Sequence, residues 1–202
     1  MPGQYTELMM TSDNAPDFTA DPCALRKACK DDAVFDDWTE PDYRAIANEL
    51  GALPEYTLLR VEDDAYQSGG WASFVEIQLA RRGIEPEIQN GYRVTQYASV
   101  TLCRIAPLAA FMKVSDEWRV LDGTNRSTAL PCVDDMTADF PWDERRRVPD
   151  VLARHGYRVL SPEVGQRTMP DGLAADTLLG GRDEDESDVA HTIFDAWFHW
   201  MD

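Results

Sequence analysis

The chain has 202 residues and a formal net charge of -18 at pH 7. A chain of this length can bury a core without the help of disulfides or metal ions. The negative charge repels nucleic acids and anionic membranes and attracts basic proteins, so we expect a basic protein partner and neither nucleic acid nor a membrane. No stretch approaches the roughly 18 uninterrupted apolar residues of a membrane helix, and no signal peptide is found, which predicts a cytoplasmic protein.

The acidity has more than one explanation. Aspartate outnumbers glutamate, and arginine supplies nearly all the positive charge, because Lys27, Lys30 and Lys113 are the only lysines. A GC-rich genome favours arginine over lysine, and a salt-adapted proteome favours acidic residues. A basic partner, genome composition and salt adaptation are therefore three separate hypotheses for the same bias.

The four cysteines, Cys23, Cys29, Cys103 and Cys132, match no zinc-binding or C-x-x-C spacing. In a reducing compartment we expect them as thiols that are mostly buried, with a Cys23–Cys29 disulfide as the less favoured alternative. Cys103 lies within "TLCRI", a pattern typical of a strand interior. This context predicts an inert buried thiol rather than a nucleophile.

The periodicities predict an α+β fold. Residues 1–20 mix proline with polar residues without a period, which predicts a flexible N-terminal arm. Residues 21–202 are expected to form a single globular domain. Its central antiparallel sheet is expected at about residues 91–135, with helices before it and an amphipathic helix at the C-terminus.

Three helices are predicted before the sheet. One covers residues 21–30, with Asp21 as its cap, and a second covers residues 39–51, with Thr39 as its cap. The third covers residues 71–83 and ends at a glycine. Its apolar stripe, with Glu76 and Gln78 off it, consists of Trp71, Phe74, Val75 and Leu79.

Strands are predicted in the middle of the chain. Residues 91–105, "GYRVTQYASVTLCRI", alternate and then become rich in β-branched side chains, which indicates one or two strands. A β pair is expected within residues 109–123, with Ser115 and Asp116 in the turn between its strands. A short helix from about Pro149 to Gly156 and a brief strand after it complete this region.

The segment "HTIFDAWFHWMD" at residues 191–202 has polar side chains on one side only. On a helix the polar residues fall within an arc of roughly 100°. We therefore predict a helix that packs onto the sheet, although its aromatic and β-branched content also favours a strand. The residues on the polar arc are Asp188, His191, Thr192, Asp195, His199 and Asp202.

Two readings of the outward polar face compete. In the first, this face and the acidic loop before it contact a protein partner through Asp183, Glu184, Asp185, Glu186, Asp188, His191, Asp195 and His199. In the second, His191, Asp195 and His199 bind a metal ion in a metal-dependent hydrolase, but three ligands over two helical turns converge poorly. We expect no catalytic residues, no bound metal and no cofactor.

Two arginine groups are a further candidate site. Arg81 and Arg82 form one group, and residues 145–147 form the other. Either group can bind an anion. Because the chain is so acidic, we interpret them as partners of local carboxylates such as Asp143 and Glu144.

The last part of the chain carries a family resemblance. The stretches "YRVLSPEV", "PDGLAADTLL" and "TIFDAWFHWMD" resemble the ends of small bacterial proteins of the toxin-immunity type. The resemblance implies a protein that neutralises a cognate toxin by binding it, and it implies no catalytic residues. An acidic protein of this type suits a basic toxin, because complementary charge speeds their encounter.

Overall fold

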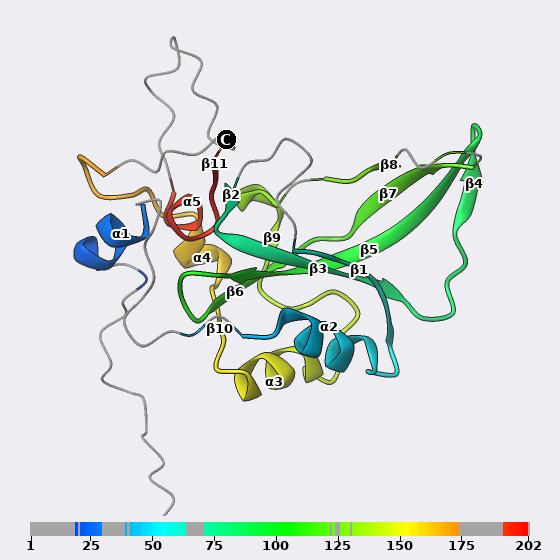
Figure 1. Ribbon diagram of the computed structural model, residues 1–202, viewed down its shortest axis with the longest axis horizontal. Helices are drawn as coiled ribbons and strands as arrows, with labels where there is room; N and C mark the ends of the chain where they lie inside the picture. Colours follow the sequence, from blue (N-terminus) through cyan, green and yellow to red (C-terminus); the bar gives the residue numbers. More distant parts are fainter. Residues whose placement is uncertain are drawn as a thin grey trace, which may run out of the picture.

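The computed structural model confirms the α+β class, with a large antiparallel sheet and helices on both of its faces (Figure 1). It describes residues 19, 21–29, 39, 41–63, 71–121, 123, 126–129, 131–173 and 192–201. The predicted N-terminal arm lies outside these residues, except for Thr19. Among the described helices, none has the length and apolar character needed to cross a membrane.

The helices are α1 (Pro22–Ala28), α2 (Tyr43–Gly51), α3 (Arg147–Arg154), α4 (Pro162–Gly165) and α5 (Ile193–Trp197), with a 3-10 turn η1 (Val133–Asp135). The strands are β1 (Tyr56–Glu62), β2 (Trp71–Ala72), β3 (Phe74–Arg81), β4 (Glu87–Gln89), β5 (Tyr92–Cys103), β6 (Leu108–Met112), β7 (Ser115–Val120), β8 (Arg126–Ser127), β9 (Met136–Thr137), β10 (Arg158–Val159) and β11 (Trp200–Met201). The main sheet has the order β1-β3-β5-β6-β10. It therefore begins before residue 91, where the sequence placed its start.

The two predicted N-terminal helices are confirmed. The Asp21 carboxylate accepts a hydrogen bond from the backbone N–H of Cys23 at the start of α1. Helix α2 begins later than predicted, because Asp42 rather than Thr39 caps it. The Asp42 carboxylate accepts from two backbone N–H groups of the first turn, as N-cap residues do. The buried face of α2 is the predicted one: Tyr43, Ile46, Ala47 and Leu50.

The predicted third helix, at residues 71–83, is wrong, because this segment forms β2 and β3. Strand β3 lies between β1 and β5, and its residues 74–79 are buried on both faces. Val75, Ile77 and Leu79 face α2 and α3, whereas Glu76 and Gln78 are buried on the opposite face. A strand that is covered on both faces does not alternate between apolar and polar residues. The spacing of the apolar residues in β3 therefore resembles that of a helix.

The predicted β pair within residues 109–123 exists as two strands, but they do not pair with each other. Both β6 and β7 run antiparallel to β5, with Phe111 opposite Val100 and Ser115 opposite Tyr97. Residues 108–120 thus follow β5 as one interrupted strand. Ser115 and Asp116 lie within β7 rather than in a turn.

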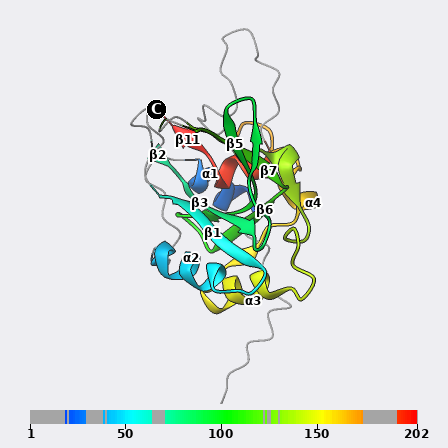
Figure 2. The ribbon, with the colours of Figure 1, turned by 90° about the vertical axis from the view of Figure 1, so that its right-hand side faces the viewer.

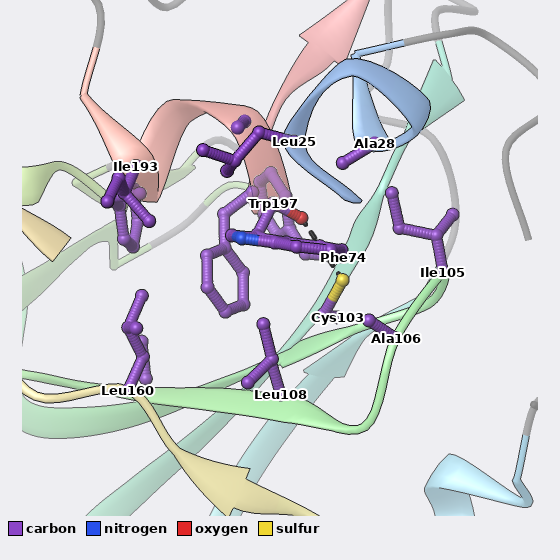
Figure 3. Packing of buried hydrophobic residues seen from close by; sticks show 14 of the residues in the cluster. Leu25, Ala28, Phe74, Cys103, Ile105, Ala106, Leu108, Leu160, Ile193 and Trp197 are labelled. Carbon is purple, nitrogen blue, oxygen red and sulfur yellow. Dashed lines mark hydrogen bonds between the residues drawn. The ribbon is translucent and has the colours of Figure 1, made fainter. Parts of the chain in front are cut away.

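Two hydrophobic cores lie on opposite faces of the sheet. One is formed with α2 and α3, which lie together below the strands in Figure 2. The other is formed with α1 and α5 around Trp197, whose backbone carbonyl accepts a hydrogen bond from the Cys103 thiol (Figure 3). Residues of this second core include Leu25, Ala28, Phe74, Ile105, Leu108, Leu160 and Ile193.

The C-terminal segment closes the second core, as predicted, but with a different geometry. Helix α5 ends at Trp197, and β11 follows and pairs with β2. Because Phe198 leaves helical geometry, the 100° spacing no longer applies to His199. His199 is only 1% exposed, so its predicted place on an outward polar face is wrong. Its backbone N–H donates to the Ser73 hydroxyl at 2.8 Å.

The cysteines are all free thiols, and the expected Cys103 environment is confirmed. Cys103 is fully buried, and burial raises the pKa of its thiol to about 12. The expectation that most cysteines are buried is wrong, because Cys23 and Cys132 are exposed and Cys29 is half-buried.

Candidate partner-binding surface

Of the eight predicted partner-binding residues, the structure describes two, Asp195 and His199. Residues 183–186, Asp188 and His191 lie outside the described residues. Asp195 is half-buried, and its carboxylate accepts hydrogen bonds of 2.8 Å from the backbone N–H and the hydroxyl of Thr192. The Thr192 hydroxyl in turn accepts from the Asp195 N–H, which completes a capping box. The Asp195 carboxylate thus caps the N-terminus of α5.

Among the described residues, the structure does not arrange the predicted metal ligands around a common point. The Nδ1 atom of His199 lies 3.1 Å from the carbonyl oxygen of Ala196, inside the second core. Within the described ranges, no group of three His, Cys, Asp or Glu side chains is placed to hold a metal ion.

A different surface stands out at the end of the sheet, where β4 and β5 form a hairpin that extends away from the helices (Figure 1). Asn90 and Gly91 join the two strands, with φ angles of 50° and 84°. A two-residue turn with both φ angles positive matches the twist of a hairpin, and Asn-Gly is its preferred sequence. The end of β7 lies beside β5 at the same place, because Tyr92 is opposite Val120.

An acidic pocket lies beside this hairpin. Its volume is about 90 Å³, and three carboxylates line it, those of Glu85, Glu87 and Asp116. Neither lysine nor arginine is among its described lining residues. The cross-strand pairs explain the arrangement, because Glu87 lies opposite Val94 on β5 and Gln96 lies opposite Asp116. Residues on the same face of neighbouring strands therefore supply the pocket walls.

Exposed apolar side chains surround the same hairpin. The large hydrophobic residues that are exposed in the described part of the chain are Ile84 (56%), Ile88 (60%), Tyr92 (40%) and Leu121 (52%). All four lie at this end of the sheet, and Tyr92 contacts the half-buried Trp118 edge-to-face, with ring centroids 6.0 Å apart. Clustered exposed apolar residues mark interaction sites, and tyrosine and tryptophan are enriched at interface hot spots.

We name this set the hairpin tip surface; its members are Ile84, Glu85, Glu87, Tyr92, Asp116, Trp118 and Leu121. Ile88 is not a member, because it lies opposite Arg93 and points to the other face of the hairpin. The sequence interpretation missed it. A signal was present in "GIEPEIQNGY", where isoleucines alternate with glutamates just before an Asn-Gly turn. Isoleucine on a short strand at the end of a sheet has no neighbouring layer to cover it.

A second polar group lies inside the sheet rather than on a surface. Glu76 is 2% exposed and accepts a hydrogen bond of 3.1 Å from Gln78. Burial raises the pKa of Glu76 to about 7, although hydrogen bonds from Ser99 and Gln78 act in the opposite direction. The adjoining cavity, lined partly by Glu76, Tyr97 and Ser99, has about 10 Å³ and suits roughly one water molecule. We therefore assign this group to the sheet interior and not to a ligand site.

Comparisons with known proteins do not extend this picture. No protein-family model matches the chain, and no curated protein or solved structure matches it. The resemblance to toxin-immunity proteins stays an expectation.

Proposed function

We propose that this chain is an acidic binding protein that holds a basic protein partner at the hairpin tip surface, and that the partner is a toxin which the chain neutralises. The observation that carries the proposal is the acidic pocket bordered by exposed apolar side chains. The apolar groups of such a surface supply affinity, and its charged groups orient the partner. The acidic loop at residues 183–188 remains a predicted second contact.

The charges favour a basic partner over a neutral one. A net charge of -18 produces a long-range field that attracts cationic proteins and speeds their encounter. The pocket of about 90 Å³ has the size of one long side chain, and its carboxylates can surround a lysine or arginine head group. Such a contact is charge-assisted and therefore stronger than a neutral hydrogen bond.

The exposed apolar residues add a hydrophobic contribution to the binding free energy, beside the electrostatic one. Ile84 and Leu121 each expose more than half of their surface, which a partner removes from water on binding. Tyr92 and Trp118 add rigid aromatic area next to the carboxylates. The combination suits a protein surface that carries both basic and apolar groups.

Isothermal titration against the basic proteins encoded by neighbouring genes tests the proposal. We expect one of them to bind with a Kd below about 1 μM at moderate salt. The triple variant Glu85→Gln, Glu87→Gln, Asp116→Asn should weaken that binding at least about tenfold. The control Asp134→Asn, Glu163→Gln, Asp171→Asn removes the same charge from exposed sites elsewhere and should leave the Kd within about twofold.

Co-expression in growing cells tests whether the basic partner is a toxin. If the partner stops growth when expressed alone, the native chain should restore growth and the tip variant should not. The proposal fails if no basic neighbour binds tighter than micromolar, or if the tip variant and its control lose the same affinity.

A further inference from the structure

The two arginine groups that are far apart in the sequence meet in one open pocket of the fold. The end of β3 and the segment before α3 line this pocket, which has a volume of about 410 Å³. It lies outside the acidic pocket of the hairpin tip surface and shares no lining residue with it. The residues that matter here are Glu55, Arg81, Arg82, Trp142, Arg145 and Arg147.

The predicted pairing of these arginines with local carboxylates holds for Arg146, which forms an ion pair with Asp139 at 3.7 Å, but not for the named partner Asp143. The Asp143 carboxylate accepts hydrogen bonds from the backbone N–H groups of Arg147 (2.9 Å) and Val148 (2.8 Å), so it holds the start of α3. The Arg147 guanidinium instead forms an ion pair with Glu55 at 3.5 Å. Glu55 and Glu144 do not balance four arginines, so the lining carries a positive charge in a strongly acidic protein.

The arginines differ in whether their guanidinium groups bond to other residues of the protein. Arg82 donates to the backbone carbonyl oxygens of Gly51, Leu53 and Tyr56 and thereby fixes the wall at the end of α2. Arg81 and Arg145 are exposed, and neither forms an ion pair with another described residue. The guanidinium groups of Arg81 and Arg145 can therefore bind a ligand. Those of Arg82 and Arg147, beside them, are held by contacts within the protein.

The remaining wall is aromatic and held in an unusual backbone conformation. Trp142 has a φ of 66°, a region that large side chains rarely adopt and that often marks a functional segment. The segment is fixed by the Tyr56 hydroxyl, which donates to the carbonyl oxygen of Pro141. Trp142 packs partly against the first core and partly lines the pocket.

We propose that this pocket binds a mononucleotide, with Arg81 and Arg145 on its phosphate and Trp142 against its base. Guanidinium groups bind phosphate through paired hydrogen bonds, and aromatic rings stack on bases. The volume lies in the range of small-molecule sites. The net charge of -18 disfavours long polyanions such as nucleic acids, so a small phosphorylated molecule fits better.

Isothermal titration of the full chain with AMP, adenosine and inorganic phosphate, at about 50 mM KCl, tests the proposal. AMP should bind saturably at one site, at least about tenfold tighter than phosphate, and adenosine should give no measurable binding. The variant Arg81→Gln, Arg145→Gln should weaken AMP binding at least about tenfold. The control Arg93→Gln, Arg119→Gln, at exposed positions of β5 and β7, should not change it.

Replacement of the ring separates a nucleotide from a simple anion. Trp142→Leu should weaken AMP binding at least about fivefold and leave phosphate binding unchanged. Absence of saturable AMP binding overturns the proposal. So does AMP binding that survives the double arginine variant, or equal affinity for AMP and phosphate together with an unaffected Trp142→Leu variant.

Discussion

Replacement of Glu76 by glutamine should make the protein more stable at neutral and alkaline pH. Burial raises the pKa of this carboxyl from 4.5 to about 7 in the folded protein. Between these values the folded state holds a proton that the unfolded state has lost, so stability falls as the pH rises through this window. At about 1.4 kcal/mol per pKa unit, the full loss above pH 7 is roughly 3 kcal/mol.

Glutamine keeps the shape of the side chain and an acceptor oxygen for the Gln78 amide, but it carries no charge to bury. Urea unfolding followed by tryptophan fluorescence, at about pH 5 and about pH 8, measures the free energy of unfolding. We expect Glu76→Gln and the native chain to differ little at the lower pH. At the higher pH the variant should be more stable by up to about 3 kcal/mol.

A matched control separates the buried charge from the overall charge. Glu87→Gln removes one negative charge from an exposed position of β4 and should change the free energy of unfolding by less than about 0.5 kcal/mol at either pH. The reasoning is refuted if Glu76→Gln keeps the pH dependence of the native chain, or if both variants gain the same stability at the higher pH.

Other regions of the fold give further predictions. Trp197→Ala should lower the free energy of unfolding by about 3 to 5 kcal/mol in urea titrations, because the side chain is fully buried, and removal of residues 190–202 should abolish cooperative melting. Asp143→Ala should cost about 1 to 3 kcal/mol, because it leaves two backbone N–H groups of α3 without their acceptor, and Asp143→Asn should cost less. The Tm should rise with KCl and level off below about 1 M as screening saturates; a continued rise at higher salt would support salt adaptation instead.

Local signals predicted the parts of the fold that depend on neighbours in the sequence. Asp21 with Pro22, and the apolar face of α2, identified two helices because caps and helical spacing act over a few residues. The alternation in β5 was equally informative. By contrast, β3 was misassigned because the cover on its two faces comes from distant elements, which no local pattern reports.

The candidate sites were harder to predict for the same reason. The acidic pocket combines residues of β4 with Asp116 of β7, and only the pairing of both strands with β5 brings them together. The two arginine groups were visible in the sequence, but only the fold places the segment before α3 beside the end of β3. His199 was placed on the wrong side because the helix ends two residues before it.

The contact between Ser73 and His199 has a consequence for synthesis on the ribosome, because the two residues are 126 positions apart. The core under α2 and α3 can close once residue 159 has emerged, whereas the core around Trp197 waits for residues 193–198. At about 5 to 20 residues per second, Ser73 waits roughly 6 to 25 s for its partner. Until then the nascent chain leaves Phe74 and, once it is made, Leu108 exposed to solvent, which makes this face of the sheet the place where chaperones are expected to act.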